Sequence, residues 1–508
     1  MTKIEQAEFV GKSGLFRLRD ISGQDRPWNA LLRMDYSEDR RVALRSLFVA
    51  LEALSLPFAG ILIRSLAPAI RSAIARPEFV WMAVLAGILT VLLGGQDRKI
   101  VSIFSGHACE SHSLRRCVIG AMGTLGIVFG LLELGLFLSH GFGRDSAMFI
   151  LLWSILSLFV LSTERYLTLR YVSTLRAAGR LTQRLAIVGS GHCADQLIAH
   201  LERFERDNRL EIVGVFDDRR SRVEGFRNPP SGTISDLIQT GKDCAIDRIL
   251  ITLPYSAESR ILDTVRRLKS LAGDIVLLPA VADWYWPSAT DEILDHAHFS
   301  LAKRPIAKWN AILKRTEDLV LGTILLLLCL PVMAMIALAI RLEGPGPILF
   351  RQRRHGYNNA EFDLYKFRSM RHSHGDPTGA KQATPSDNRV TIVGKIIRRL
   401  SLDELPQLFN VVRGEMSLVG PRPLPIGMRT DGLLCSDIVD EYAHRHRVKP
   451  GLTGWAQVNG SRGATHLKEQ VKERVAYDLE YIRNWSILFD LQIILRTVWV
   501  VVKCDKAF

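Results

Sequence analysis

Two adjacent carboxylates, Asp403 and Glu404, stand in the stretch of this sequence whose residue types best suit chemistry. Apolar residues follow them at helical spacing: Leu405, Leu408, Phe409 and Val412. This spacing predicts a helix with a buried face, and Ser401 with Glu404 fits a capping box at its start. The partial positive charge of a helix N-terminus keeps a carboxylate ionised and attracts phosphate. The acidic pair could therefore act on a phosphorus atom, or it could only cap the helix.

The composition of the chain favours an anionic partner and a reducing compartment. Lysine and arginine total 66 against 52 acidic residues, which gives a formal charge of +14 over 508 residues. Such an excess suits nucleic acid, a phospholipid surface or a nucleotide-type substrate. The seven cysteines form no CxxC pair, which argues against a zinc site and a disulfide framework. The polar start of the chain lacks the apolar stretch of a removable signal peptide, and the length suggests about three domains.

Four long apolar runs follow a polar leader at residues 1–41, which we expect to be cytoplasmic. The runs cover residues 42–66, 79–95, 117–140 and 147–161. Each approaches the roughly 20 residues that a helix needs to cross hydrocarbon, so residues 42–165 predict a four-helix transmembrane bundle. Basic residues before the first run and after the fourth place both ends in the cytoplasm. Glu52 and Glu133 would lie at membrane depth, either in a functional site or hydrogen-bonded inside the bundle.

Residues 184–300 have the pattern of a Rossmann-like α/β domain. Buried strands are expected at residues 185–189, 211–218, 248–253 and 274–278, with a helix that buries Leu197, Ile198 and Leu201. Strands that alternate with helices favour a parallel sheet. Gly189 and Gly191, with Asp217 at the end of the second strand, resemble a dinucleotide fingerprint. NAD or another nucleotide is therefore a candidate ligand, and a domain without a cofactor is the alternative.

A fifth apolar run, residues 319–340, lies in the last part of the chain, residues 303–508. Basic residues flank it on both sides, including Arg315 before it and Arg341 after it. Positive flanks on both sides are costly for a helix that crosses the membrane. Pro331 removes a backbone hydrogen bond in the middle of the run. We therefore expect a re-entrant hairpin with a broken turn at the proline, entering and leaving on the cytoplasmic face.

Four motifs in the last part of the chain occur together and in one order. They are KFRSM from Lys366, DELPQLFNV from Asp403, SLVGPRP from Ser417 and KPGLTGWAQVNG from Lys449. With these motifs, residues 303–508 resemble the bacterial sugar transferase family, polyprenyl-phosphate sugar-1-phosphate transferases, and the whole chain resembles its large form. The resemblance implies a multi-domain membrane protein with a four-helix transmembrane domain, a Rossmann-like domain and an α/β monotopic catalytic domain with a re-entrant helix. It implies a multi-pass protein of the bacterial inner membrane whose soluble domains are cytoplasmic.

The resemblance also implies a reaction. Members transfer a sugar-1-phosphate from a UDP-sugar to undecaprenyl phosphate and release UMP, the first step of exopolysaccharide or O-antigen synthesis. Asp403 would be the nucleophile that attacks the β-phosphorus and forms a covalent phosphosugar intermediate. Glu404 would either position it or share in metal and proton handling. Mg²⁺ is implied, with Asp403 as its contact. Glucose-1-phosphate is the first expectation for the sugar and galactose-1-phosphate the second, on family frequency alone.

Five basic residues in or near these motifs are candidates for phosphate contacts. They are Lys366, Arg368, Arg422, Arg445 and Arg447. Arginine can hold phosphate oxygens with two donors at once, and the prolines on both sides of Arg422 hold its backbone rigidly. A solvated surface charge is the alternative for each of the five.

The partners expected from the resemblance are a UDP-sugar, undecaprenyl phosphate and inner-membrane lipids, with no nucleic acid. The oligomeric state stays open, a homo-oligomer included. One rival function is a membrane-bound nucleotide-sugar dehydratase or oxidoreductase, although Tyr255 lacks a lysine four residues later, where Ser259 stands. The other rival is a non-catalytic scaffold for polysaccharide assembly, which would leave the Asp403 region unexplained.

Overall fold

The computed structural model describes most of the chain, and its elements fall into two compact units. The described residues are 36–66, 76–94, 114–140, 144–204, 210–219, 227–278, 299–370, 389–461, 463 and 467–502. The helical unit comprises the described residues of Arg40–Thr182, and the α/β unit comprises those before and after it. Most of the predicted leader at residues 1–41 lies outside the described residues.

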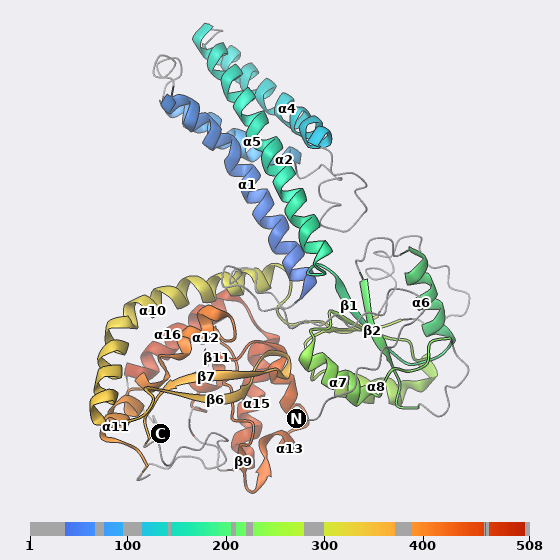
Figure 1. Cartoon of the computed structure of the whole chain (residues 1–508), viewed down its shortest axis with the longest axis vertical. Coiled ribbons are helices and arrows are strands. Elements are labelled where there is room, and N and C mark those ends of the chain that lie inside the picture. Colours follow the sequence, from blue (N-terminus) through green and yellow to red (C-terminus); the bar gives the residue numbers. More distant parts are fainter. Residues whose placement is uncertain are drawn as a thin grey trace. The chain divides into compact units, whose positions relative to one another are not determined.

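The helical unit contains a helix for each of the four predicted apolar runs. These are α1 (Ser37–Leu66), α2 (Arg76–Gly94), α4 (Leu114–His140) and α5 (Arg144–Ala177), which lie beside one another in Figure 1. Their shared core includes Leu56, Phe79, Phe129 and the fully buried Trp153, whose Nε1 donates to the carbonyl of Leu56 at 2.8 Å. Within the described residues, α1, α5 and the helix Trp309–Glu343 of the C-terminal part are long and apolar enough to cross a membrane, while α2 and α4 hold shorter apolar segments.

The two glutamates expected at membrane depth differ in their surroundings. Glu52 on α1 accepts a hydrogen bond from Nε of Arg165 on α5 at 2.7 Å, and both side chains are buried. The expectation of a hydrogen-bonded group inside the unit is therefore confirmed for Glu52. It is wrong for Glu133, which is exposed on α4.

The predicted Rossmann-like sheet is confirmed, with an additional edge strand. Strands β1 (Gln183–Val188), β2 (Leu210–Phe216), β3 (Arg248–Ile251) and β4 (Asp274–Leu277) are parallel, and β5 (Phe299–Ala302) pairs antiparallel with β4. The spatial order is β2-β1-β3-β4-β5. Helix α6 (His192–Phe204) packs on one face through Leu197, Ile198 and Leu201, as predicted. Helices α7 (Ile234–Asp243) and α8 (Glu258–Leu268) pack on the other.

The C-terminal part is built from a long helix, small sheets and shorter helices around several apolar clusters. The order is α10 (Trp309–Glu343), β6 (Leu349–His355), β7 (Glu361–Phe367), α11 (Ile392–Arg399), η7 (Leu402–Glu404), α12 (Gln407–Arg413), β8 (Ser417–Val419), β9 (Arg429–Thr430), β10 (Leu433–Leu434), α13 (Cys435–Ile438), η8 (Tyr442–Arg447), β11 (Gly451–Thr453), α14 (Trp455–Val458), α15 (Lys468–Arg483) and α16 (Ile487–Val502). Strands β6 and β7 form an antiparallel hairpin, and β8 pairs in parallel with β11. One of these clusters brings together Leu364, Leu408, Val411 and Tyr481.

Helix α10 differs from the hairpin with a broken turn that the sequence predicted. It is one helix from Trp309 to Glu343 with Pro331 inside it, and Figure 1 shows it bending along its length. A proline inside a helix removes one backbone hydrogen bond and bends the helix without ending it. The helix has many exposed apolar side chains, among them Leu327, Leu328 and Met335.

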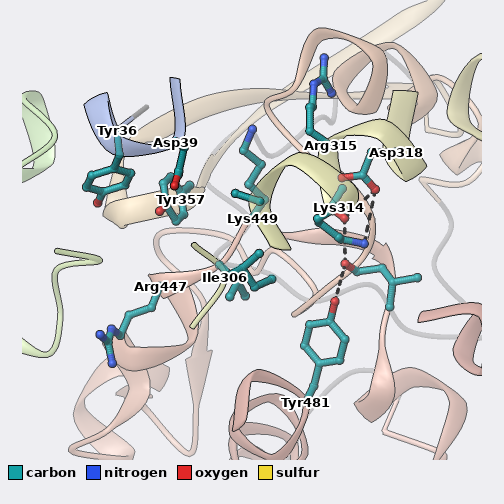
Figure 2. Close-up of a pocket in the computed structure, with 14 residues that line it drawn as sticks. Tyr36, Asp39, Ile306, Lys314, Arg315, Asp318, Tyr357, Arg447, Lys449 and Tyr481 are labelled. Carbon is teal, nitrogen blue, oxygen red and sulfur yellow. Dashed lines mark hydrogen bonds and ion pairs between the residues drawn. The ribbon is translucent and has the colours of Figure 1, made fainter. Parts of the chain in front are cut away.

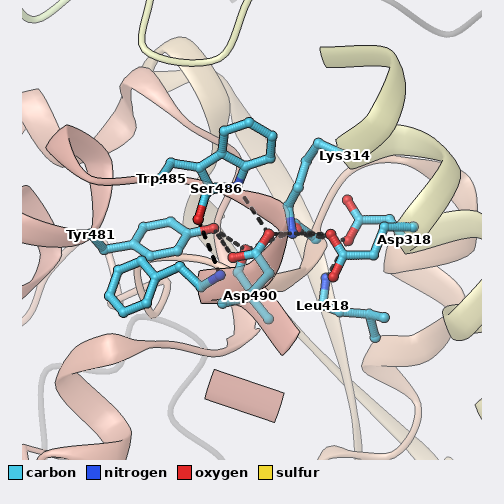
Figure 3. A network of polar contacts seen from close by, with 11 residues as sticks. Lys314, Asp318, Leu418, Tyr481, Trp485, Ser486 and Asp490 are labelled. Atoms are coloured by element: carbon cyan, nitrogen blue, oxygen red, sulfur yellow. Dashed lines mark hydrogen bonds and ion pairs between the residues drawn. The ribbon is translucent and has the colours of Figure 1, made fainter. Parts of the chain in front are cut away.

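A buried polar network fixes the first turns of α10 to the rest of the C-terminal part (Figure 3). Nζ of Lys314 donates to Oδ2 of Asp490 on α16 at 2.6 Å. Asp490 also accepts from the hydroxyl of Tyr481 at 2.9 Å and from Nε1 of Trp485 at 2.9 Å. Asp318 accepts from the hydroxyl of Ser417 and the backbone N–H of Leu418, both at 2.8 Å. The base of α10 is therefore held by hydrogen bonds of defined geometry in addition to apolar contacts.

Candidate active site

The acidic pair lies in a turn before α12, and the predicted capping box is wrong. Ser401 has φ +56°, in the left-handed region, and its side chain makes no capping hydrogen bond. Asp403 and Glu404 belong to the short turn η7, while α12 begins only at Gln407. Leu408 and Val411 are the fully buried apolar residues of α12, whereas Leu405, Phe409 and Val412 are half-buried. The side chain of Glu404 is consequently available for other partners.

Glu404 is held by two of the predicted phosphate-binding residues. Nζ of Lys366, on β7, donates to its Oε1 at 2.8 Å. Arg422 uses two nitrogens, with Nη1 to Oε2 at 3.1 Å and Nη2 to Oε1 at 2.5 Å. Burial alone would raise the pKa of Glu404, but Arg422 and Lys366 lower it well below the usual value. Glu404 is therefore an ionised, fixed carboxylate that orients two cations.

Asp403 has a different environment although it is the next residue. It is half-buried, and no described residue forms a hydrogen bond or an ion pair with its carboxylate. Burial raises the pKa of Asp403, against the lowering effect of Lys366, and the charge of Glu404 raises it further. Asp403 is thus the member of the pair whose oxygen atoms are available to react.

Three further predicted phosphate-binding residues have structural acceptors. Arg368 donates to the carbonyls of Ile340, Gly344 and Pro345 at 2.7–3.0 Å, at the C-terminal end of α10. Arg445 is 1% exposed, forms an ion pair with Asp478 at 2.6 Å and donates to the carbonyl of Arg422 at 2.7 Å. Arg447 donates to the carbonyl of Lys303 at 2.8 Å. Of these three, only Arg445 contacts the group of residues around Glu404.

Glycines of two motifs explain how the backbone before Arg422 is positioned. Strands β8 and β11 bring Gly420 against Gly451 and Gly454, so closely that a Cβ at Gly451 would overlap the backbone nitrogen of Gly420. Only glycine permits this approach of two backbones. The motif from Ser417 and the motif from Lys449 are therefore parts of one structure, which sets the direction of the Arg422 loop.

Two basic residues near the acidic pair were missed by the sequence analysis. The charge of Arg398, at the end of α11, acts on Asp403 and lowers its pKa, a smaller effect than that of burial. Arg354, on β6, is 8% exposed and donates to the carbonyl of Pro423 at 3.2 Å. Neither lies in one of the four motifs, and only the general excess of basic residues could have pointed to them.

The glycine loop of the Rossmann-like domain is already in contact with Asp217. Oδ2 of Asp217 accepts from the backbone N–H of Ser190, between Gly189 and Gly191, at 3.1 Å. Oδ1 accepts from the N–H of Arg219 at 2.9 Å, and the side chain is 1% exposed. In dinucleotide-binding domains such an acid accepts from the ribose, and the loop faces the pyrophosphate. The residues here do not fit NAD in that way, and the ligand of this domain stays a prediction.

A cavity of about 70 Å³ lies beside the base of α10, and Figure 2 shows residues that line it. Its lining includes Lys314, Asp318, Ser417 and Tyr481, but neither Asp403 nor Glu404. The volume suffices for a few water molecules. We therefore assign this cavity to the anchor of α10 and not to the chemistry.

Comparisons with known proteins agree with the resemblance seen in the motifs. A family profile described as bacterial sugar transferase matches residues 309–504, and one described as a CoA-binding domain matches residues 110–279. The chain is 34% identical over 381 residues, 74% of this chain and 78% of the relative, to the UDP-glucose:undecaprenyl-phosphate glucose-1-phosphate transferase of Xanthomonas campestris pv. campestris. The chain belongs to the bacterial sugar transferase family. An enzyme of the same name from Escherichia coli (strain K12) is 38% identical over 62% of this chain and 67% of the relative.

A further relative of this bacterial sugar transferase is matched over a smaller share of its length. It is the undecaprenyl-phosphate glucose phosphotransferase of Komagataeibacter xylinus, 40% identical over 68% of this chain. The match spans 64% of that relative, which is less than two thirds of its length. The acidic pair, Lys366, Arg354 and Arg422 all lie inside the residues that the family profile matches.

The described carboxylates near the acidic pair of this bacterial sugar transferase could bind Mg²⁺ only together with oxygen atoms of a substrate. Among the described residues, no group of three or more His, Cys, Asp or Glu side chains could hold a metal ion. Mg²⁺ in phosphate-transfer sites usually takes one or two carboxylates and completes its shell with substrate phosphates and water. Asp403 has a carboxylate free for this purpose, whereas both oxygens of Glu404 are bonded to cations.

Proposed function

We propose that this protein transfers glucose-1-phosphate from UDP-glucose to undecaprenyl phosphate and releases UMP. The difference between Asp403 and Glu404 carries the proposal, because a fixed, ionised carboxylate stands beside one to which no described residue bonds. The names of the relatives support the two substrates and the sugar. Neither rival function, an oxidoreductase or a scaffold, accounts for such a pair.

The first half of the proposed reaction forms a covalent intermediate. An oxygen of ionised Asp403 attacks the β-phosphorus of UDP-glucose, and a bond from Asp403 to phosphorus forms. The bond between this phosphorus and the bridging oxygen breaks, and UMP leaves with the electron pair. Lys366 and Arg422, oriented by Glu404, stabilise the negative charge that develops on the phosphate oxygens.

The second half returns the enzyme to its starting state. A phosphate oxygen of undecaprenyl phosphate attacks the same phosphorus, the bond to Asp403 breaks, and undecaprenyl-diphosphate-glucose leaves. The two half-reactions keep the two anionic substrates from meeting directly. Mg²⁺, held by Asp403 and the diphosphate, would neutralise phosphate charge when bound.

UMP release from the purified full chain in nanodiscs tests the proposal. We expect sustained release with UDP-glucose and undecaprenyl phosphate together, and much slower release with UDP-galactose or UDP-N-acetylglucosamine. Equal rates with all three donors would remove glucose from the proposal. No UMP from any donor would refute the reaction itself.

The pH dependence of the rate should report the ionisation of Asp403. Since Asp403 attacks only when ionised and its pKa is raised, the rate should fall as pH drops through that raised pKa. The pKa of Glu404 is lowered, so Glu404 stays charged across this range. Lys366 lowers the pKa of Asp403, so Lys366→Met should move the acid limb of the kcat/KM profile to higher pH. An acid limb that stays in place in the variant would contradict this assignment.

We also propose that the soluble parts lie on the cytoplasmic side of a bacterial inner membrane, with α1, α2, α4 and α5 crossing as a four-helix bundle. Helix α10 would enter and leave on the cytoplasmic face, bent at Pro331. Its exposed apolar side chains, the exposed apolar residues Leu488, Leu495 and Trp499 of α16, and the basic flanks of α10 support this arrangement. A site at that face can reach a soluble nucleotide sugar and a lipid phosphate.

Cysteine labelling at the two ends of α10 should give the same sidedness. Asn310 and Arg341 are exposed and suitable for substitution, whereas Arg315 is 6% exposed and bonded to the carbonyls of Val411 and Val412. We expect Asn310→Cys and Arg341→Cys to react with an impermeant maleimide in inside-out vesicles only, above the labelling of the parent chain. Reaction of the two positions from opposite sides would mean that α10 crosses the membrane.

A further inference from the structure

Arg354 is a buried cation that forms no ion pair within the described part of the chain. It lies on β6 and is 8% exposed. Its Nη1 donates to the carbonyl of Pro423 at 3.2 Å and its Nη2 to Oε1 of Gln352 at 2.5 Å, while its buried Nε has no hydrogen-bond partner. No carboxylate of a described residue forms an ion pair with it. Buried charges are normally paired, because an unpaired charge is costly to remove from water. The burial of this guanidinium therefore needs a functional explanation.

The surroundings of Arg354 carry an excess of positive charge. The cations around the acidic pair are Lys366, Arg354, Arg398, Arg422, Arg445 and Arg474, and the carboxylates are Asp403, Glu404 and Asp478. Arg474 is 3% exposed, and its hydrogen bonds go to neutral oxygens of Ser461 and Gly463. Six cations therefore accompany three carboxylates among these described residues.

Burial and the neighbouring positive charges both lower the pKa values of Arg354 and Arg474. Burial and then the charge of Arg422 lower the pKa of Arg354 to about 9. Burial and then the charges of Arg445 and Arg422 lower the pKa of Arg474 to about 10. A bound anion with two negative charges would offset the repulsion among these arginines and raise the pKa values of both Arg354 and Arg474.

Arg354 and Arg445 also hold the loop of Arg422 on both sides. Arg445 donates to the carbonyl of Arg422, and Arg354 donates to the carbonyl of Pro423. Both retain buried N–H groups without partners, Nε in Arg354 and Nε and Nη1 in Arg445. These two guanidinium groups hold the loop and still have N–H groups that could bind an anion. Such a pair of arginines is typical of a site for phosphate oxygens.

We propose that Arg354 is a further substrate-binding residue, which joins Arg422 in holding the diphosphate of the nucleotide sugar. This inference rests on the proposed function for the identity of the anion. Its chemistry requires only a nucleoside phosphate, so UMP can serve as the probe. The diphosphate supplies the negative charge that the buried carboxylates lack.

Isothermal titration of UMP into the full chain in nanodiscs tests the assignment. We expect Arg354→Met to weaken UMP binding by about tenfold or more, because a hydrogen-bonded charge contact is lost. The KM for UDP-glucose should rise by a similar factor. Arg354→Lys keeps the charge but not the planar fork, and it should recover part of the affinity. The matched control is Arg353→Met on the same strand, whose side chain is 75% exposed and which should bind UMP normally.

A purely structural role for Arg354 predicts another pattern. Loss of the bond to Pro423 would then lower kcat and the unfolding temperature but leave the dissociation constant of UMP within about twofold of wild type. That result would overturn the proposal. If Arg354→Met does not fold, Arg354→Lys provides the test. Unchanged UMP affinity in the lysine variant would refute a contact between the planar guanidinium of Arg354 and the phosphate. A wild-type chain that binds UMP but releases none from UDP-glucose would refute the proposed function and leave the Arg354 test intact.

Discussion

Replacement of Asp403 by asparagine should lower UMP release by about three orders of magnitude or more, because the attacking oxygen is lost. Asparagine has the same shape as aspartate, and no described residue bonds to the carboxylate of Asp403. The variant should therefore fold and insert like the parent chain. The measurement is UMP release from purified protein in detergent or nanodiscs, with the unfolding temperature as the check on folding.

The covalent intermediate gives a second readout for the same variant. Incubation with radiolabelled UDP-glucose in the absence of lipid should leave label on the wild-type protein, at most one per active site, and none on Asp403→Asn. Asp437→Asn on the exposed surface of α13 is the matched control and should keep both labelling and turnover. Near-normal turnover in Asp403→Asn, or label at another residue, would remove Asp403 from the role of nucleophile.

The parts of this site that the sequence predicted are those set by local pattern and by motif. The residue types of Lys366, Arg422 and the acidic pair predict phosphate chemistry, and the structure brings all four residues together. The sequence also predicted the parallel sheet of the Rossmann-like domain, from apolar strands that alternate with helical segments. Such a pattern can be read from residues that are close together in the sequence.

Features that depend on distant contacts were missed or misjudged. Glu404 suits a capping box by spacing, but the stronger partners Lys366 and Arg422 are distant in sequence, so it bonds to them instead. The left-handed backbone of Ser401 then starts the turn η7 without a cap. Arg354 and Asp478 reach their partners Pro423 and Arg445 only when β6 and α15 pack near the Arg422 loop. No local sequence pattern identifies either residue as part of the site.

The anchor of α10 belongs to the same class of distant contacts, and it links α10 to the site. Helix α10 packs against α12, whose preceding turn carries the acidic pair: Gly322 allows α10 to approach Val411, and Arg315 donates to the carbonyls of Val411 and Val412. The ion pair of Lys314 with Asp490 fixes the same end of α10 to α16. The orientation of the acidic pair relative to α10 therefore depends on buried hydrogen bonds and ion pairs, which stabilise the structure only when every partner is present.

Removal of Asp490 alone should destabilise the protein more than removal of both Lys314 and Asp490. Asp490→Leu leaves the buried Lys314 without its closest acceptor, at a cost of about 3–5 kcal/mol, and should lower the unfolding temperature by roughly 6–20 °C. The double variant Lys314→Met with Asp490→Leu removes the unpaired cation and should recover part of that loss. The recovery is incomplete because Glu317 and Asp318 lose Lys314, and the donors of Tyr481 and Trp485 lose Asp490. Thermal unfolding of the full chain in nanodiscs measures both. If the single and double variants lose the same stability, the hydrogen bonds from Tyr481 and Trp485 to Asp490, and not the ion pair, hold the base of α10.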